Sequence, residues 1–140
     1  MANKVRQDYD ARMQASIMAK AQISEFVSST TELKYKLFEH HIFGGGRRQP
    51  EPLSKFADDY NHNHASKYVE PIIIYVPNNS GNIIIQAKFK SDTGVSEFLR
   101  GKTLSLSYVR GKSDSGHWQC GLNSIGVTDI EKYYLPDSCR

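Results

Sequence analysis

The pattern of apolar and polar positions divides the chain into a helical first third and a strand-rich second half. Residues 1–43 contain neither Gly nor Pro, and their apolar residues recur at helical spacing, which predicts one continuous helix. The first half of this helix carries a narrow track with one apolar residue per turn, namely Val5, Tyr9, Met13 and Ile17. The second half carries a broader apolar face, made of Ile23, Phe26, Val27, Leu33 and Leu37. The glycines at 44–46 then end the helix.

The length of this predicted helix limits what it can pack against. A helix of about 40 residues would be about 60 Å long, and no domain of this size can cover it over that whole length. We therefore expect the narrow track to project and the broad face to pack on the rest of the domain.

Residues 44–66 have the composition of a long connecting loop. They contain three consecutive glycines, Pro50, Pro52 and a polar run from Asn61 to His64. Long loops in compact domains tend to be functional or mobile.

The apolar period changes to that of strands in the second half. Strands are predicted at residues 69–76, 82–89, 103–109 and 117–120, separated by turn segments at 77–81, 92–94 and 112–116. Residues 103–109 (TLSLSYV) alternate apolar and polar, which predicts one buried face and one face in water. The fold class is therefore α+β, with a long N-terminal helix packed on a four-stranded antiparallel meander.

Composition adds limits on location and partners. The 140 residues are 39% hydrophobic and 24% charged, as in one ordinary globular domain, and the longest apolar run is residues 72–76. A bilayer-spanning helix needs about 20 apolar residues, so none is predicted. The net charge of +3 comes from residues 1–48, with eight Lys or Arg against five Asp or Glu. A solvated helix face explains these cations as well as a nucleic-acid surface does.

Both cysteines, Cys120 and Cys139, lie near the C-terminus. They could form a disulfide, remain two free thiols or supply half of a metal site. The absence of a CxxC pair and of zinc-type Cys/His spacing favours the disulfide, and with it an oxidising compartment. Such a bridge would stabilise the fold by about 3 kcal/mol in the chain-entropy model.

Several motifs in order along the chain resemble those of one family. Residues 19–25 (AKAQISE) resemble a helix motif, 67–69 (KYV) and 83–90 the first two strands, and 101–104 (GKTL) the start of the third. The most specific match is the ending, residues 118–120 (WQC) followed by 132–140 (KYYLPDSCR). Together they resemble a type IV pilin of the a subclass, over most of the chain.

The family pattern also differs from this sequence at its start. Pilins of this kind begin with a long apolar helical segment after a short basic leader, so we expect the sequence to be a soluble head from which that segment has been removed. Residues 7–12 (QDYDAR) resemble a family motif that normally overlaps the one at 19–25. Either helical turns are inserted here, or part of residues 1–18 is foreign sequence.

The resemblance implies a structural role. The missing segment would anchor the full-length, N-terminally methylated protein in the inner membrane and then pack in the filament core. The head would form the outer wall of a surface pilus used for adhesion, twitching motility and DNA uptake. The partners would be other copies and other pilins, with a host receptor or DNA as further ligands. The track of Val5, Tyr9, Met13 and Ile17 would be the assembly face.

The resemblance also assigns regions of the chain. Residues 44–66 correspond to the variable αβ-loop, 67–120 to the sheet, and 121–140 to the C-terminal disulfide loop, called the D-region. Within it we expect subunit or receptor contacts at Gly121, Asn123, Asp129, Lys132 and Asp137. The apolar residues of this segment are expected to pack underneath, namely Leu122, Ile125, Val127 and Ile130.

The sequence also contains residues that could bind a metal, phosphate or DNA. The histidines at 40, 41, 62 and 64 suggest a metal or nuclease site, but lack the further ligands and are better explained as loop residues. The segment 44–48 (GGGRR) follows a helix, which is the wrong end for binding phosphate. Trp118 is expected in the core, and DNA remains an alternative ligand for Lys4, Arg6, Arg12 and Lys20.

No nucleophile and base pair is recognisable, so neither catalysis nor a cofactor or metal is predicted. The alternatives to a filament subunit are a minor pilin that binds DNA or a receptor, and a type II secretion pseudopilin. Major pseudopilins stabilise this region with calcium, so the cysteine pair argues against the latter.

Overall fold

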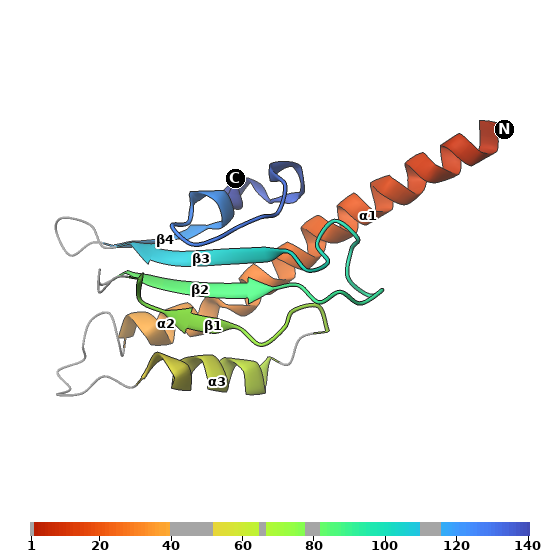
Figure 1. The fold of residues 1–140 in the computed structure, drawn as a ribbon. Helices are drawn as coiled ribbons and strands as arrows, with labels where there is room; N and C mark the ends of the chain where they lie inside the picture. Colours follow the sequence, from red (N-terminus) through yellow and green to blue (C-terminus); the bar gives the residue numbers. More distant parts are fainter. Residues whose placement is uncertain (1, 40–51, 65–66, 78–81, 110–115) are drawn as a thin grey trace.

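A long helix runs behind a four-stranded sheet and projects beyond it (Figure 1). The computed structural model describes residues 2–39, 52–64, 67–77, 82–109 and 116–140, with side chains from residue 7 onward. The helix consists of α1 (Ala2–Ser29) and α2 (Thr31–Leu37). Its N-terminal half extends past the sheet, while its C-terminal half and α2 lie against one face (Figure 1). We call the sheet and the elements packed on it the head.

The single predicted helix is interrupted at Thr30. The Thr30 hydroxyl donates a hydrogen bond to the Val27 carbonyl at 2.6 Å, and the Ser29 hydroxyl donates one to the Phe26 carbonyl at 2.6 Å. Such side-chain bonds to the preceding turn compete with the helical ladder and bend helices. The prediction of one continuous helix is therefore wrong at this position, and its last residues, 40–43, lie outside the described part of the chain.

The sheet is an antiparallel meander in the order β1-β2-β3-β4. Its strands are β1 (Ile73–Tyr75), β2 (Ile83–Lys88), β3 (Thr103–Val109) and β4 (His117–Cys120). The register places Ile74, Ile85, Leu106 and Cys120 in one row across the sheet. All four side chains are buried in the core. The α+β class and the antiparallel meander predicted from the sequence are thus confirmed.

The first strand is shorter than predicted. Only Ile73–Tyr75 pairs continuously, and Val69 forms a separate bridge with Phe89 on the other side of Pro71. Proline lacks the N–H that a strand ladder needs. At the outer edge of the sheet, the Asn61 side chain accepts the Ile72 N–H at 2.8 Å and donates to the Ile72 carbonyl at 3.2 Å. This side chain therefore satisfies backbone groups that would otherwise lack a strand partner.

The broad apolar face of the helix packs on the sheet. Ile23, Phe26, Leu33 and Leu37 are buried and Val27 is half-buried against the same core. Phe26 meets Phe89 edge to face at 6.4 Å between ring centroids. Burial of such a side chain contributes about 1.5–3 kcal/mol, so this contact is a principal source of stability in the head.

A helix, α3 (Leu53–Asn63), lies within the segment predicted as a loop. Phe56, Ala57 and Tyr60 share one face of it and are buried, and the helix lies beside α2 and β1 (Figure 1). The prediction of a loop is wrong here because three buried contacts outweigh the polar composition of residues 58–64. Residues 44–51 and 65–66 lie outside the described part of the chain.

The second face of the sheet is also covered, contrary to the alternation in β3. Ser105 and Ser107, predicted to face water, are fully buried. The C-terminal segment lies over them, and the Ser105 hydroxyl is 3.0 Å from the hydroxyls of Ser124 and Thr128. The Ser107 hydroxyl accepts the N–H of Ile125 at 3.2 Å. The prediction of a wet face is therefore wrong, since a partner distant in sequence satisfies these hydroxyls.

A disulfide joins Cys120 at the end of β4 to Cys139, which confirms the sequence-based prediction. Between them lie three short 3-10 helices, η3 (Gly121–Asn123), η4 (Lys132–Tyr134) and η5 (Asp137–Cys139). Ile130, Leu135 and Cys139 are the buried apolar residues of this segment. The bridge thereby holds an irregular segment against the sheet.

The close packing of the C-terminal segment predicts a stability defect for Gly126→Ala. A Cβ at this position would lie 2.8 Å from the Ser105 Cβ and 2.9 Å from an Ile84 methyl group. We expect a loss of about 1–3 kcal/mol in the free energy of unfolding, measured by urea denaturation. Gly94→Ala is the matched control, because no atom lies within 4 Å of its added Cβ. Equal stability of the two variants would contradict the described packing.

Replacing both cysteines by serine tests the role of the bridge. The disulfide closes a loop with a sequence separation of 19, so Cys120→Ser with Cys139→Ser should lower the free energy of unfolding by about 3 kcal/mol. Hydrogen exchange should rise first in residues 121–140, because irregular segments with few backbone ladders open locally. An unchanged exchange pattern in that segment would show that packing alone holds it.

Candidate functional site

The projecting half of α1 carries an exposed apolar track. Tyr9, Met13 and Ile17 are 63%, 45% and 62% exposed, and each lies one turn from the next. The Val5 side chain, the fourth member predicted from the sequence, lies outside the described side chains. We call these four residues the apolar track. Large side chains this exposed at regular spacing are typical of a surface that binds another protein.

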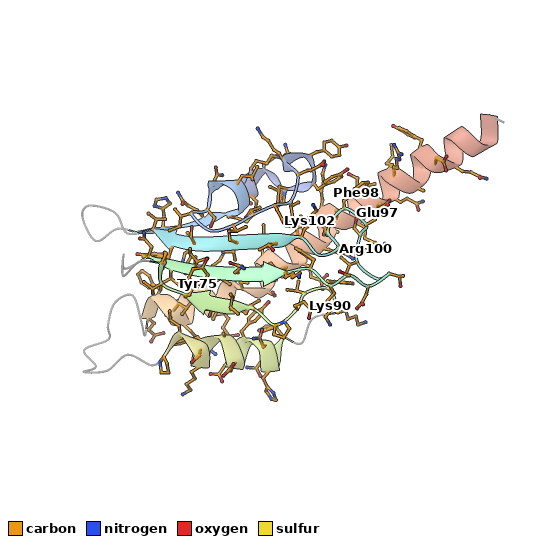
Figure 2. All side chains as sticks on the ribbon, in the orientation of Figure 1. Tyr75, Lys90, Glu97, Phe98, Arg100 and Lys102 are labelled. Carbon is orange, nitrogen blue, oxygen red and sulfur yellow. A yellow bond between two sulfur atoms is a disulfide. The ribbon has the colours of Figure 1, made fainter. Side chains whose placement is uncertain are left out.

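A groove borders this track where α1 leaves the head. It has a volume of about 560 Å³, and one wall is the α1 surface from Tyr9 to Lys20. The opposite wall comes from two segments far apart in sequence, Glu97 and Phe98 of the β2–β3 connection and Tyr133 and Tyr134 of η4. We call it the neck groove. Figure 2 shows Glu97 and Phe98 beside α1 at this point.

Aromatic rings and cations make up much of the neck groove. Phe98 and Tyr134 are stacked at 4.3 Å, and Tyr133 meets Tyr134 edge to face at 5.2 Å. The ammonium of Lys20 lies 4.6 Å above the centre of the Tyr133 ring, in cation–π geometry. Burial raises the pKa of Tyr134, and the charge of Glu131 acts in the same direction. The groove thus presents aromatic faces bordered by two cations, Arg12 and Lys20, and one carboxylate, Glu97.

The sequence alone did not reveal the second wall of this groove. Glu97 and Phe98 lie outside every motif, and the motif at 132–140 that contains Tyr133 does not say what this ring faces, because only the tertiary fold brings the β2–β3 connection and η4 to the same side of α1. The one available indication was that the chain places Tyr133 and Tyr134 between the two cysteines.

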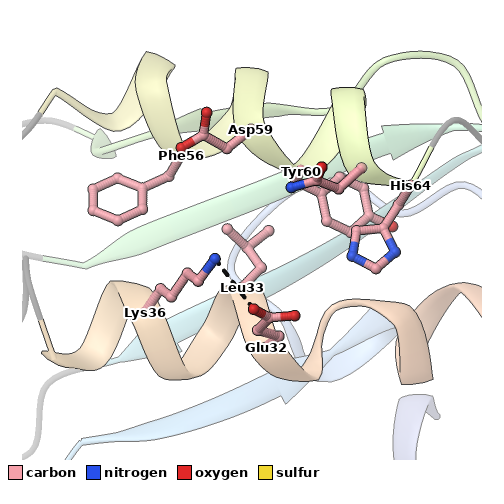
Figure 3. Close-up of a pocket in the computed structure, with 8 residues that line it drawn as sticks. Glu32, Leu33, Lys36, Phe56, Asp59, Tyr60 and His64 are labelled. Atoms are coloured by element: carbon pink, nitrogen blue, oxygen red, sulfur yellow. Dashed lines mark ion pairs between the residues drawn. The ribbon is translucent and has the colours of Figure 1, made fainter.

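A smaller cleft of about 210 Å³ lies between α2 and α3 (Figure 3). Leu33, Phe56 and Tyr60 contribute its apolar side, and Glu32, Lys36, Asp59, Asn63 and His64 its polar side. Lys36 pairs with Glu32 at 3.2 Å within α2. The Tyr60 hydroxyl is 2.5 Å from the Ser29 hydroxyl, and burial raises its pKa while this hydrogen bond opposes the shift. These contacts hold α3 to the rest of the head.

The histidines considered as metal ligands do not form a metal site in the described residues. His64 stacks on Tyr60 at 4.7 Å and His62 is exposed. No group of three His, Cys, Asp or Glu side chains among the described residues is arranged to hold a metal ion. His40, His41 and the GGGRR segment at 44–48 lie outside the described part of the chain.

The predicted contact residues of the C-terminal segment differ in their surroundings. Asn123, Asp129, Lys132 and Asp137 are exposed. Asp129 accepts the Thr103 N–H at 2.6 Å, and Asp137 pairs with Arg140 at 3.1 Å. Gly121 is instead buried, with φ at +63° and space for a Cβ blocked by the Cys139 carbonyl. Its predicted contact role is therefore wrong, because it forms the tight turn at the disulfide.

Three apolar residues of this segment are on its surface. Leu122, Ile125 and Val127 are 46%, 50% and 60% exposed, and only Ile130 of the four predicted to pack underneath is buried. The prediction is wrong for the first three because the serines of β3 bind the backbone and hydroxyls of this segment, which turns those side chains outward.

The remaining cationic and aromatic candidates pack locally. Trp118 is half-buried beside the core and meets Tyr108 edge to face at 5.5 Å. Lys34 of α2 lies 5.7 Å from its ring centre, and burial lowers the pKa of Lys34. Arg12 is exposed on α1, and the side chains of Lys4 and Arg6 lie outside the described ones. Among the described residues, no helix has both the length and the apolar character to cross a bilayer.

Comparisons with known proteins identify the family. The family Pilin (bacterial filament) matches residues 19–140, which include the C-terminal half of α1, the sheet and the disulfide. Comparison with curated protein sequences gives no match. The long helix on a four-stranded antiparallel sheet with a C-terminal disulfide is the arrangement that this family implies. The chain therefore belongs to the pilin family, the structural subunits of bacterial pili.

Proposed function

We propose that the chain assembles into a type IV pilus through the apolar track on the projecting half of α1. The observation that carries this proposal is the exposure of Tyr9, Met13 and Ile17, at 63%, 45% and 62%, on a helix that has left the head. Each such side chain would contribute about 1.5–3 kcal/mol on full burial. Neighbouring helices in a filament offer that burial, whereas the head of the same chain borders the track only at the neck groove and leaves these side chains exposed.

The asymmetry of the molecule supports a filament over a closed pair. The track lies on the projecting helix, whereas the exposed apolar patch of Leu122, Ile125 and Val127 lies on the C-terminal segment. Contacts between different surfaces of identical subunits form rings or open helical filaments.

We propose that Asn123, Asp129, Lys132 and Asp137 contribute subunit or receptor contacts on the outer wall of such a filament.

The biological roles proposed here are those that the resemblance to type IV pilins implies. We propose that the filament is displayed on the bacterial surface, where it serves adhesion and twitching motility and takes part in DNA uptake. In this proposal the subunit resides in the inner membrane before assembly, and the head described above becomes the outer wall of the filament.

Charge substitution on the apolar track tests the assembly surface. Met13→Glu or Ile17→Glu would place a carboxylate in a helix–helix contact, where desolvation of an unpaired charge costs several kcal/mol. We expect loss of filaments in electron micrographs of the producing cells. Both side chains are exposed in the subunit, so the circular dichroism and unfolding midpoint of the head should stay unchanged.

Gln14→Glu is the matched control, since it adds the same charge to the same helix at an exposed position outside the track. Cells with this variant should keep their filaments. Filaments of normal number from the Met13 and Ile17 variants would refute the track as an assembly surface.

A minor pilin that binds nucleic acid is the second candidate function. The neck groove favours it, because Arg12 and Lys20 border the rings of Phe98, Tyr133 and Tyr134. Single strands bind where cations follow the backbone and aromatic faces stack on bases. The two candidates differ in the phenotype of a strain that lacks the gene: loss of all pili indicates a major subunit, whereas persisting pili indicate a minor one.

Salt dependence of DNA binding distinguishes the two candidates in solution. A groove that binds DNA should shift a labelled single strand at low salt, and the shift should weaken steeply with added salt because phosphate contacts release counterions. Lys20→Ala should weaken the shift, while Lys55→Ala on α3 should not. The absence of a shift at low salt would remove this second function.

A further inference from the structure

The structure assigns Gln22 and Ser96 a positioning role: together they fix the direction in which α1 leaves the head. We call this pair and its backbone partners the neck clamp. This inference rests on the proposed function, since the direction of the helix matters only if its projecting half contacts other subunits. The contacts themselves are independent of that function and can be measured in the isolated chain.

Gln22 connects α1 to the backbone of the β2–β3 connection. Its side-chain amide donates to the Gly94 carbonyl at 2.9 Å, and its side-chain oxygen accepts the Ser96 N–H at 3.0 Å. The side chain is 5% exposed. Both ends of one amide are thus used, on two backbone groups more than 70 positions away in sequence. A two-point contact of this kind restrains rotation as well as separation.

Ser96 makes the reciprocal contact at Ala15, about two turns closer to the projecting half than Gln22. Its hydroxyl donates to the Ala15 carbonyl at 2.7 Å, and the residue is fully buried. Ala15 is half-buried and Ser16 is buried, whereas every described residue from 7 to 14 is exposed. The clamp therefore acts where α1 changes from buried to exposed as it leaves the head.

The connection that contacts α1 is itself held firmly. Val95 and Leu99 are fully buried on either side of Ser96. The Arg100 Nε donates to the carbonyls of Val95 and Asp92 at 2.9 and 3.1 Å. Figure 2 shows Glu97, Phe98 and Arg100 gathered where α1 departs. Gln22 thus binds a fixed part of the head, so its hydrogen bonds transmit the orientation of the sheet to the helix.

The length of the projecting half makes this orientation consequential. The stretch from Ala15 back to the start of α1 covers about 20 Å at 1.5 Å per residue. A rotation of about 10° at the clamp would move the end of that stretch by about 3–4 Å, which is close to the rise of two helical residues. Packing of side chains between neighbouring helices does not tolerate such a shift.

The clamp also gives a physical role to a motif of the sequence. Residues 19–25 resemble the pilin helix motif, and several of its members contact the head. Ile23 packs in the core and Lys20 lies over the Tyr133 ring. Ala19 is fully buried, which suits a small residue where α1 approaches the head closely, and Gln22 supplies the clamp. A Gln buried among apolar residues in this helix is explained by its two backbone partners.

The test compares Gln22→Ala, Ser96→Ala and the double variant in the 140-residue chain by NMR. In the parent chain, residual dipolar couplings of residues 7–14 and of β2 and β3 should fit one alignment tensor. In the variants, we expect that common fit to be lost through a reduction of the couplings of residues 7–14. Order parameters in that stretch should fall from about 0.85 towards 0.6. Gln14→Ala is the matched control at an exposed position of the same helix.

Two readouts separate positioning from ordinary stabilisation. A residue that only stabilises the head would lower the unfolding midpoint without changing the orientation of residues 7–14. Ser96→Ala removes only the hydroxyl contact and keeps the fold testable if Gln22→Ala proves unstable. A single alignment tensor that persists in Ser96→Ala and in every folded Gln22→Ala sample would overturn the inference.

Electron microscopy of the producing cells separates this inference from the proposed function. If the clamp fixes the direction of α1 and the chain assembles into filaments, Gln22→Ala should change filament number or subunit spacing, while Gln14→Ala should not. If the parent chain is absent from filaments, the proposed function is wrong. The residual dipolar couplings still show whether Gln22 and Ser96 fix the orientation of α1. If the helix loosens and filament number and spacing stay normal, the clamp has no role in assembly and its functional part is overturned.

Discussion

The packing of the apolar face of α1 and α2 on one side of the sheet is the contact on which the rest of the molecule depends. A helix of 28 residues is about 42 Å long, while the longest strand, with seven residues, spans about 23 Å. The sheet can therefore bury Ile23 and Phe26 but cannot reach Tyr9 or Met13. The exposure of these apolar side chains is the direct consequence of that mismatch, and the proposed assembly into a filament depends on it.

Further contacts hold the head together on both faces of the sheet. On the far face of the sheet, the C-terminal segment binds the buried hydroxyls of Ser105 and Ser107 and is joined to β4 by the disulfide. On the helix side, Gln22 and Ser96 link α1 to the β2–β3 connection. The sheet is thus tied both to the C-terminal segment and to the projecting helix by specific contacts.

Much of this arrangement could be predicted, and the failures have identifiable causes. The bounds of β3 and β4 follow from residues 103–109 and 117–120, because strand period and flanking turns are local properties. Helix α3 was missed because its polar residues dominate the composition, although Phe56 and Tyr60 are one turn apart. The break at Thr30 was missed because Ser and Thr are compatible with a helix until their hydroxyls find a carbonyl in the preceding turn.

The features of the candidate site also fall into those that follow from local sequence and those that depend on distant segments. The α+β class, the apolar track, the cysteine pair and the family motifs can be read from the chain alone, because each depends on residues close together in it. The burial of Gly121, the exposure of Val127 and the position of Phe98 and Tyr133 across one groove from α1 are visible only in the folded chain. These properties depend on which distant segment covers a given face. Periodicity reports that a residue alternates with its neighbours, but it carries no information about what lies opposite.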